Sequence, residues 1–309
     1  MIWIALALAG AAGALLVGMI GFGTSLVVLP TLAILFPTLF AADTALRLAT
    51  GTTMATMAVG AVAAGLAQSR GGHVSWPLLR LAILPYAVGA FLGPWTARYL
   101  PVDVLRIYVA GMLMVVGLWT LRGRSSACGG QRDWRAHHLE LGAVFFAIGF
   151  ASSMAGIASG LFAIPYLSRF AIPLRTIIGT STVGAALYSA FGTLGHISAG
   201  WNMVDPPSWS LGYVYLPAVA VMAVAGAACA PLGVRLAGRM NDRLLRILLA
   251  VVILCAALVI AWPSVQWAQR ISASVVPELA ARREQPPASY SRIASRCRFT
   301  SCGASIMVK

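Results

Sequence analysis

The sequence predicts an all-α polytopic membrane protein built from two inverted repeats of about five membrane helices each, with glycine-broken helices that meet near the midplane. Three features support this prediction: 60% of the 309 residues are apolar and only 10% are charged, long stretches carry no charge, and two glycine-containing motifs recur. A soluble domain has about 25% charged residues. The mean hydropathy of +0.85 agrees with a membrane protein.

Several uncharged stretches are long enough to cross a membrane. A transmembrane helix needs about 20 apolar residues, and its backbone must be satisfied within the span, which excludes an ordinary sheet. The uncharged stretches cover residues 1–42, 48–69, 81–97, 107–121, 141–168, 176–204, 206–234 and 247–269. We therefore expect a multi-pass protein of the cell membrane that is surrounded by lipids.

The net charge of +14 could suggest a nucleic-acid partner. Most basic residues lie at the ends of apolar stretches, however, as expected for arginines that set membrane topology or reach toward headgroups. We therefore expect no nucleic-acid partner. The five cysteines contain no CxxC pair, so neither a disulfide framework nor a metal site is predicted, and no cofactor is expected.

An internal repeat organises the chain. The motif "GMIGFGTSLVVLP" at 18–30 matches "SMAGIASGLFAIP" at 153–165, and four further pairs follow in the same order. They are "RLATGTTM" (47–54) with "RTIIGTST" (175–182), "LP" (84–85) with "LP" (216–217), "GPWTAR" (93–98) with "APLGVR" (230–235), and "VLRI" (104–107) with "LLRI" (244–247). Such ordered matches indicate a duplicated unit.

The repeat predicts the domain boundaries. A first transmembrane repeat covers 1–121, a hydrophilic linker 122–138, a second repeat 139–264, and a polar, flexible tail 265–309. Paired membrane halves with corresponding glycine-interrupted segments are typical of repeat-built transporters.

Arginine placement favours five passes per repeat, and therefore inverted repeats. With ten passes, twelve arginines outside the tail fall on one side and three on the other, whereas eight passes give no useful bias. The larger group is Arg70, Arg80, Arg122, Arg124, Arg132, Arg135, Arg169, Arg175, Arg235, Arg239, Arg243 and Arg246. The smaller group is Arg47, Arg98 and Arg106.

These motifs resemble the TauE/SafE sulfite exporter family over about residues 5–262. The resemblance rests on a glycine-rich break running into aliphatic residues and "LP" or "IP", then "A-x-G-T" or "I-x-G-T", twice in one chain. It implies a secondary transporter or facilitator of small sulfur-containing anions such as sulfite, sulfonates, thiosulfate or related organic anions. The implied process is export by alternating access across a bacterial inner membrane. The family's breaks usually contain more consecutive glycines than this chain has.

The membrane interior contains no predicted carboxylate, because all eight acidic residues lie at segment ends, in loops or in the tail. A cation relay would need such a group. Neutral groups can instead bind an anion where a broken helix begins, since its first N–H groups are unpaired and the helix dipole is positive there. The candidate substrate-binding residues are Gly21, Gly23, Thr24, Ser25, Gly51, Thr52, Thr53, Gly156, Ser159, Gly160, Gly179, Thr180, Ser181 and Thr182.

Other interpretations of these residues remain open. Small residues also mark close helix packing, and serine or threonine can bond its own backbone. Arg47 and Arg175 are either interfacial anchors or attract anions to the mouth of the pathway. His196 is either an interfacial residue or a group that couples transport to protons.

The sequence argues against an enzyme. It contains no HExxH, no GxSxG and no paired carboxylates, so a membrane-embedded enzyme acting on a lipid is the weaker alternative. It also contains no nucleotide-binding GxxxxGK[ST], so this chain is not expected to consume ATP. An anion channel is a third alternative, although a pore ring usually comes from an oligomer. Whether this chain forms a homo-oligomer stays open.

Overall fold

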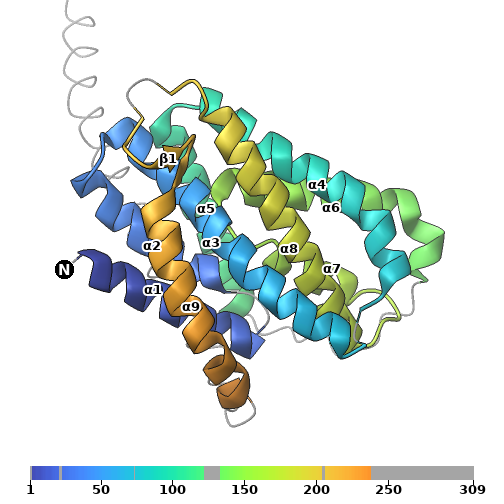
Figure 1. Cartoon of the computed structure of the whole chain (residues 1–309). Helices are drawn as coiled ribbons and strands as arrows, with labels where there is room; N and C mark the ends of the chain where they lie inside the picture. Colours follow the sequence, from blue (N-terminus) through green and yellow to red (C-terminus); the bar gives the residue numbers. More distant parts are fainter. Residues whose placement is uncertain (1, 21–22, 73, 122–132, 204–205, 238–309) are drawn as a thin grey trace, which may run out of the picture. The chain divides into compact units, whose positions relative to one another are not determined.

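The computed structural model describes residues 2–20, 23–72, 74–121, 133–203 and 206–237. Within these residues the chain is mostly helical (Figure 1). The α-helices are α1 (Ile2–Ile20), α2 (Thr24–Leu35), α3 (Ala42–Arg70), α4 (Trp76–Tyr99), α5 (Val102–Leu121), α6 (His138–Ala155), α7 (Gly160–Leu167), α8 (Leu174–Ala199) and α9 (Leu216–Ala237). Two 3₁₀ turns are η1 (Phe36–Thr38) and η2 (Trp134–His137). The predicted tail and most of the predicted linker lie outside the described residues.

Four helical segments are long and apolar enough to cross a membrane: Asp43–Arg70, Trp76–Tyr99, Trp134–Ala155 and Thr176–Ala199. At 1.5 Å per residue, the 24 residues of α4 extend over about 36 Å, more than the hydrocarbon core of about 30 Å. Shorter apolar helical segments cover Ile2–Leu16, Thr24–Thr38 and Leu216–Cys229. Large apolar side chains such as Leu84 and Val224 point outward and are more than 70% exposed, as expected for surfaces that face lipid.

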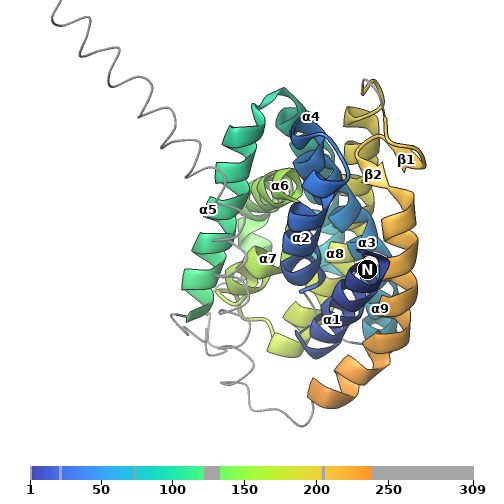
Figure 2. The ribbon, with the colours of Figure 1, turned by 90° about the vertical axis from the view of Figure 1, so that its left-hand side faces the viewer.

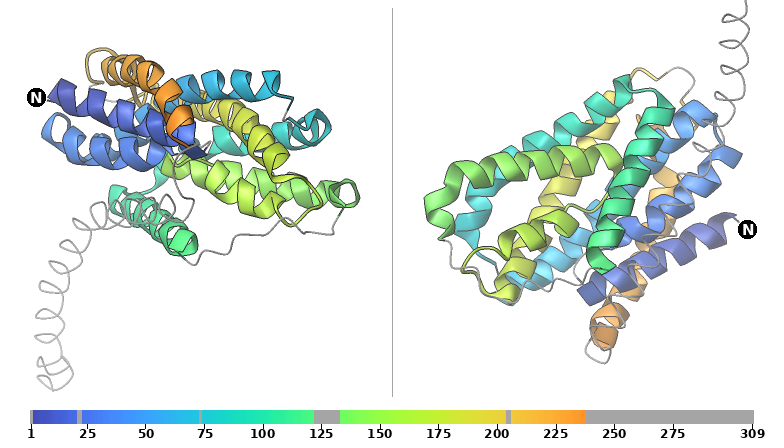
Figure 3. Two further views of the ribbon diagram at one scale, coloured as in Figure 1. Left: turned by 90° about the horizontal axis from the view of Figure 1, so that it is seen from below. Right: turned by 180° about the vertical axis from the view of Figure 1, so that it is seen from behind.

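Two helix pairs form the most extensive contacts, and each joins the first part of the chain to the second. Helix α1 packs along α9, and α4 packs along α6 (Figures 2 and 3). Glycines permit both approaches: a Cβ on Gly10 of α1 would lie 2.6 Å from the Met222 carbonyl oxygen. A Cβ on Gly93 of α4 would lie 2.6 Å from the Phe150 carbonyl oxygen. These glycines therefore serve close packing, which holds helices together where lipid is as apolar as the side chains.

The contacts also give the directions of the central helices. Helix α4 runs parallel to α8, because Ser75 bonds Thr180 near their beginnings and Trp95 bonds Ser198 near their ends. Helices α3 and α8 run antiparallel. A Cβ on Gly65, late in α3, would contact Val183 early in α8, whereas one on Gly51 would contact His196 late in α8.

The described arginines gather at two opposite ends of these helices. Arg70 ends α3, Arg80 lies in the first turns of α4, and Arg169 precedes α8; we call this the Arg70 end. Arg47 lies near the start of α3 and bonds the carbonyl that follows α4; we call this the Arg47 end. Arg98 and Arg106 flank the same α4–α5 connection.

A small hairpin departs from the expected all-α fold. Strands β1 (Ser210–Leu211) and β2 (Val214–Tyr215) pair antiparallel, with Ser210 opposite Tyr215, between α8 and α9. The hairpin also bonds the last turn of α8: the Tyr213 N–H donates to the His196 carbonyl at 3.2 Å. Tyr213 and Val214 are buried, so the hairpin folds inward against α3 and α8 at the Arg47 end.

Candidate functional site

The first predicted break separates α1 from α2. Helix α1 ends at Ile20 and α2 begins at Thr24, with Gly23 as its N-cap. Gly23 has a φ of 145°, a conformation that favours glycine, and a Cβ there would lie 3.0 Å from the Cβ of Leu16. Thr24 and Ser25 are buried at the start of α2. Gly21 lies outside the described residues.

The second break separates α6 from α7. Gly156 ends α6 with a φ of 68°, and its N–H bonds the carbonyls of Ser152 and Ser153. The next N–H, of Ile157, also returns to the Ser152 carbonyl at 2.9 Å, which is the pattern of a glycine-terminated helix. Helix α7 then begins at Gly160 with Ser159 as its N-cap.

The two breaks touch one another. The backbone N–H of Ala158 donates to the hydroxyl oxygen of Ser25 at 2.9 Å, although the residues are 133 positions apart. The second break also packs on α3, where a Cβ on Gly156 would lie 2.9 Å from the Cα of Thr50. The clusters around residues 23–25, 51–53 and 156–160 therefore adjoin.

The Gly51 cluster lies inside α3 and faces the hairpin. The Thr52 hydroxyl oxygen accepts the Tyr215 N–H at 3.0 Å, while the Thr53 hydroxyl donates to the Ala49 carbonyl at 2.7 Å. The carbonyl of Tyr213 approaches Gly51 so closely that no side chain would fit there. Gly51 therefore allows the hairpin to pack closely against α3.

The Gly179 cluster makes the corresponding contact at the Arg70 end. The Thr180 hydroxyl oxygen accepts the N–H of Ser75, the N-cap of α4, at 2.9 Å. Thr182 donates to the Ile178 carbonyl at 2.8 Å, and Gly179 is buried. The buried Ser181 hydroxyl has no hydrogen-bond partner in the structure. Thr52 and Thr180, matched in the repeat, thus each hold the residue that precedes an apolar helix.

Two tyrosines that the sequence analysis did not select complete this region. The Tyr188 hydroxyl donates to the Ile157 carbonyl in the second break at 2.9 Å. The Tyr86 hydroxyl lies within reach of the Ser159 hydroxyl, without ideal hydrogen-bond geometry. The two rings stack with centroids 5.1 Å apart. A tyrosine within an apolar span is itself a signal, because its buried hydroxyl needs a polar partner.

His196 is buried and not interfacial, which corrects one expectation. Only 2% of its surface is exposed, since the hairpin covers the end of α8. Its Nε2 lies 3.3 Å from the carbonyl oxygen of Ser153, and the Ser153 hydroxyl donates to the Ala90 carbonyl at 2.6 Å. His196 thus joins α8 to the last turn of α6.

The predicted mouth arginines are only partly described. Arg47 donates from Nη2 to the Leu100 carbonyl at 2.8 Å, so it anchors the end of α4. The Arg175 side chain lies outside the described part of the structure.

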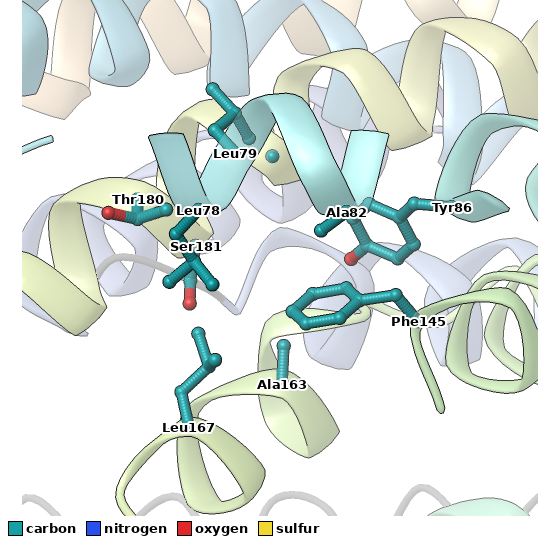
Figure 4. Close-up of a pocket in the computed structure, with 10 residues that line it drawn as sticks. Leu78, Leu79, Ala82, Tyr86, Phe145, Ala163, Leu167, Thr180 and Ser181 are labelled. Atoms are coloured by element: carbon teal, nitrogen blue, oxygen red, sulfur yellow. The ribbon is translucent and has the colours of Figure 1, made fainter. Parts of the chain in front are cut away.

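A small cavity lies beside the Gly179 cluster, between α4, α6, α7 and α8 (Figure 4). Its walls are mostly apolar, and its polar side chains are Tyr86, Thr180 and Ser181. Its volume of about 10 Å³ is about enough for one water molecule. Among the described residues, no group of three or more His, Cys, Asp or Glu side chains could hold a metal ion.

Apolar helices that enclose neutral hydroxyls and helix breaks define a multi-pass helical membrane protein. The chain belongs to the TauE/SafE family: it matches the family described as "Sulfite exporter TauE/SafE" over residues 6–260. It is accordingly a membrane transporter by family.

Curated relatives agree with this class. A "Probable membrane transporter protein" of Haemophilus influenzae is 30% identical over 227 residues, covering 69% of this chain and 80% of the relative. Two proteins of the same description from Xylella fastidiosa strains 9a5c and Temecula1 are each 27% identical, covering 73% of this chain and 83% of the relative. No solved structure matches the chain significantly.

Proposed function

We propose that this protein is a secondary transporter of small sulfur-containing anions, such as sulfite, thiosulfate or sulfonates, and that it exports them across a bacterial inner membrane by alternating access. The observation that carries the proposal is the Ser25–Ala158 hydrogen bond, which joins the two helix breaks. The starts of α2 and α7, which follow the two matched motifs of the repeat, therefore lie side by side among buried, uncharged groups. Helix starts of this kind favour a negative ligand.

Inverted repeats fit the helix contacts. If α1 corresponds to α6 and α4 to α9, as the sequence matches require, exchanging the halves converts the α1–α9 pair into the α4–α6 pair. These are the two most extensive contacts in the described part of the chain. The exchange also converts the Thr52–Tyr215 hydrogen bond into the Thr180–Ser75 bond.

Two further contacts support an inverted orientation of the repeats. Helices α3 and α8 are counterparts in the repeat and run antiparallel, as inverted halves require. Helices α1 and α2 pack side by side, so the chain turns back at the first break. This supports two passes there, and it supports the ten-pass count that assigns the arginines of the Arg70 end and the Arg47 end to opposite sides.

In this proposal the substrate binds between the halves where the candidate clusters around residues 23–25, 51–53 and 156–160 adjoin, while the cluster at 179–182 lies nearer the Arg70 end. The hydroxyls of Ser25, Thr52 and Ser159 are buried in this conformation, and access therefore needs the halves to separate at one end at a time. Neutral donors hold a hydrated anion less tightly than a paired charge would, which suits a carrier that must also release it.

The test is flux through the purified protein in liposomes, with sulfite, thiosulfate and small sulfonates as probes. We expect saturable uptake in which these anions compete. The variant Gly160→Leu should abolish it, whereas Gly111→Leu should not, because no atom lies within 4 Å of a Cβ at Gly111. Flux that never saturates would favour a channel, and lipid turnover without flux would favour an enzyme.

A further inference from the structure

The cavity of Figure 4 lies at the Arg70 end of the α4–α8 interface. Leu78 from the start of α4, Leu167 from the last turn of α7 and Ser181 from the start of α8 line it. The hydrogen bond between Ser75 and Thr180 closes the same interface nearer that end.

An unpaired polar group faces the cavity. Ser181 is only 8% exposed, and its hydroxyl oxygen is buried without a hydrogen-bond partner. Figure 4 shows this hydroxyl directed toward Leu167, on the opposite side of the cavity. An unpaired buried hydroxyl is costly, and a bound water or ion is one explanation for a native protein retaining it.

A second hydroxyl connects the cavity to the second break. Tyr86 lines the cavity from α4, and its hydroxyl reaches toward Ser159, the N-cap of α7. The Ser159 hydroxyl is itself fully buried. Ser181, Tyr86 and Ser159 thus form a series of neutral hydroxyls that leads from the cavity to the predicted anion site.

The matching positions of the first repeat lack these features. Thr53 corresponds to Ser181, but its hydroxyl is satisfied by the Ala49 carbonyl. Counted from the matched residues Ser75 and Tyr215, Tyr86 of α4 corresponds to Gly226 of α9, which carries no hydroxyl. Packing of a duplicated fold therefore does not require the Ser181–Tyr86 pair, and a role in binding explains it better.

We propose that this cavity is a subsite of the transport pathway, in which the hydroxyls of Ser181 and Tyr86 bind the anionic group of the substrate between the Arg70 end and the helix breaks. This inference rests on the proposed transport function. The cavity accommodates about one water molecule, so the anion enters when α4 moves away from α8 and the Ser75–Thr180 bond opens. The exposed guanidinium groups of Arg80 and Arg169 raise the local anion concentration at this end.

Thiol labelling in proteoliposomes tests the subsite without requiring a known substrate. In the full chain with its five cysteines replaced by alanine, Ser181→Cys is compared with Thr53→Cys, its counterpart. The probes are two methanethiosulfonates of similar size, one ending in a sulfonate and one in a trimethylammonium. We expect the sulfonate reagent to modify Ser181→Cys about tenfold faster than Thr53→Cys, and faster than the cationic reagent does.

Adding Tyr86→Phe to Ser181→Cys should lower the preference for the sulfonate reagent about threefold, because only a hydroxyl is lost. Full labelling in detergent verifies that both thiols are present and reactive. Equal rates at the two positions, or a preference for the cation, would overturn the subsite. If the labelling is anion-selective but the protein transports none of the sulfur-containing anions, the proposed substrate is wrong and the subsite is still supported.

Discussion

The hydroxyl of Thr52, within α3, accepts a hydrogen bond from the backbone N–H of Tyr215, which precedes α9, at 3.0 Å. The matched Thr180 does the same for Ser75 before α4, at 2.9 Å. A helix start buried in an apolar environment needs partners for its free N–H groups. The duplicated Gly-Thr motif therefore has a structural use in addition to its proposed role in binding.

Replacing Thr52 with valine removes this acceptor while preserving the side-chain shape. We expect a loss of about 1 kcal/mol in the free energy of unfolding, and a similar loss for Thr180→Val, because a partly buried N–H is left unpaired. The measurement is the midpoint of unfolding in detergent on titration with SDS. Thr96→Val is the control, since its hydroxyl is exposed and bonds only its own helix; equal effects at all three positions would contradict the interpretation.

Ser25→Ala should weaken the contact between the two breaks. The Ala158 N–H then loses its hydrogen-bond acceptor, and we expect about 1–2 kcal/mol of destabilisation together with a lower flux of the transported anion. Ser69→Ala is the matched control, because the Ser69 hydroxyl is exposed and bonds the Leu66 carbonyl within its own helix. Unchanged flux and stability in Ser25→Ala would show that this hydrogen bond does not hold the breaks together.

Gly156→Ala tests the close approach of the second break to α3. Gly156 and Gly72 have nearly the same φ, 68° and 69°, so alanine at either position costs about 1–2 kcal/mol of backbone strain. At Gly156 the new Cβ would also lie 2.9 Å from the Cα of Thr50, whereas at Gly72 it meets no atom within 4 Å. Thermal unfolding in detergent should therefore place Gly156→Ala clearly below Gly72→Ala, and coinciding midpoints would argue against the close approach.

Tyr188→Phe removes the hydroxyl that binds the Ile157 carbonyl and leaves the ring stacked on Tyr86. We expect about 1 kcal/mol of destabilisation and reduced transport, because the second break loses one support. Tyr99→Phe serves as the comparison, since Tyr99 is 75% exposed at the end of α4. The two variants should differ in flux measured in the same liposomes; if they do not, the Ile157 contact is irrelevant to transport.

Much of this architecture could be predicted from local patterns. The uncharged stretches located the long helices. The glycines at 23 and 156 have positive φ, which few other residues adopt, and they flank the ends of helices. The partners across these breaks could not be predicted. Ser25 and Ala158 are 133 residues apart, and no periodicity encodes which backbone N–H a hydroxyl will meet. The roles of Tyr86 and Tyr188 were missed for the same reason.

By itself, the sequence determined that the chain is a multi-pass membrane protein with long apolar helices, since these features depend on transfer free energy over local stretches; the duplication stays a prediction from the matched motifs. Only the tertiary structure decided that the hairpin buries His196, that Tyr213 packs against Gly51, and that Ser181 faces a cavity while the Thr53 hydroxyl bonds its own helix. Those outcomes depend on which helices pack against one another. Close packing between segments distant in the sequence decides this, and local sequence patterns do not specify it.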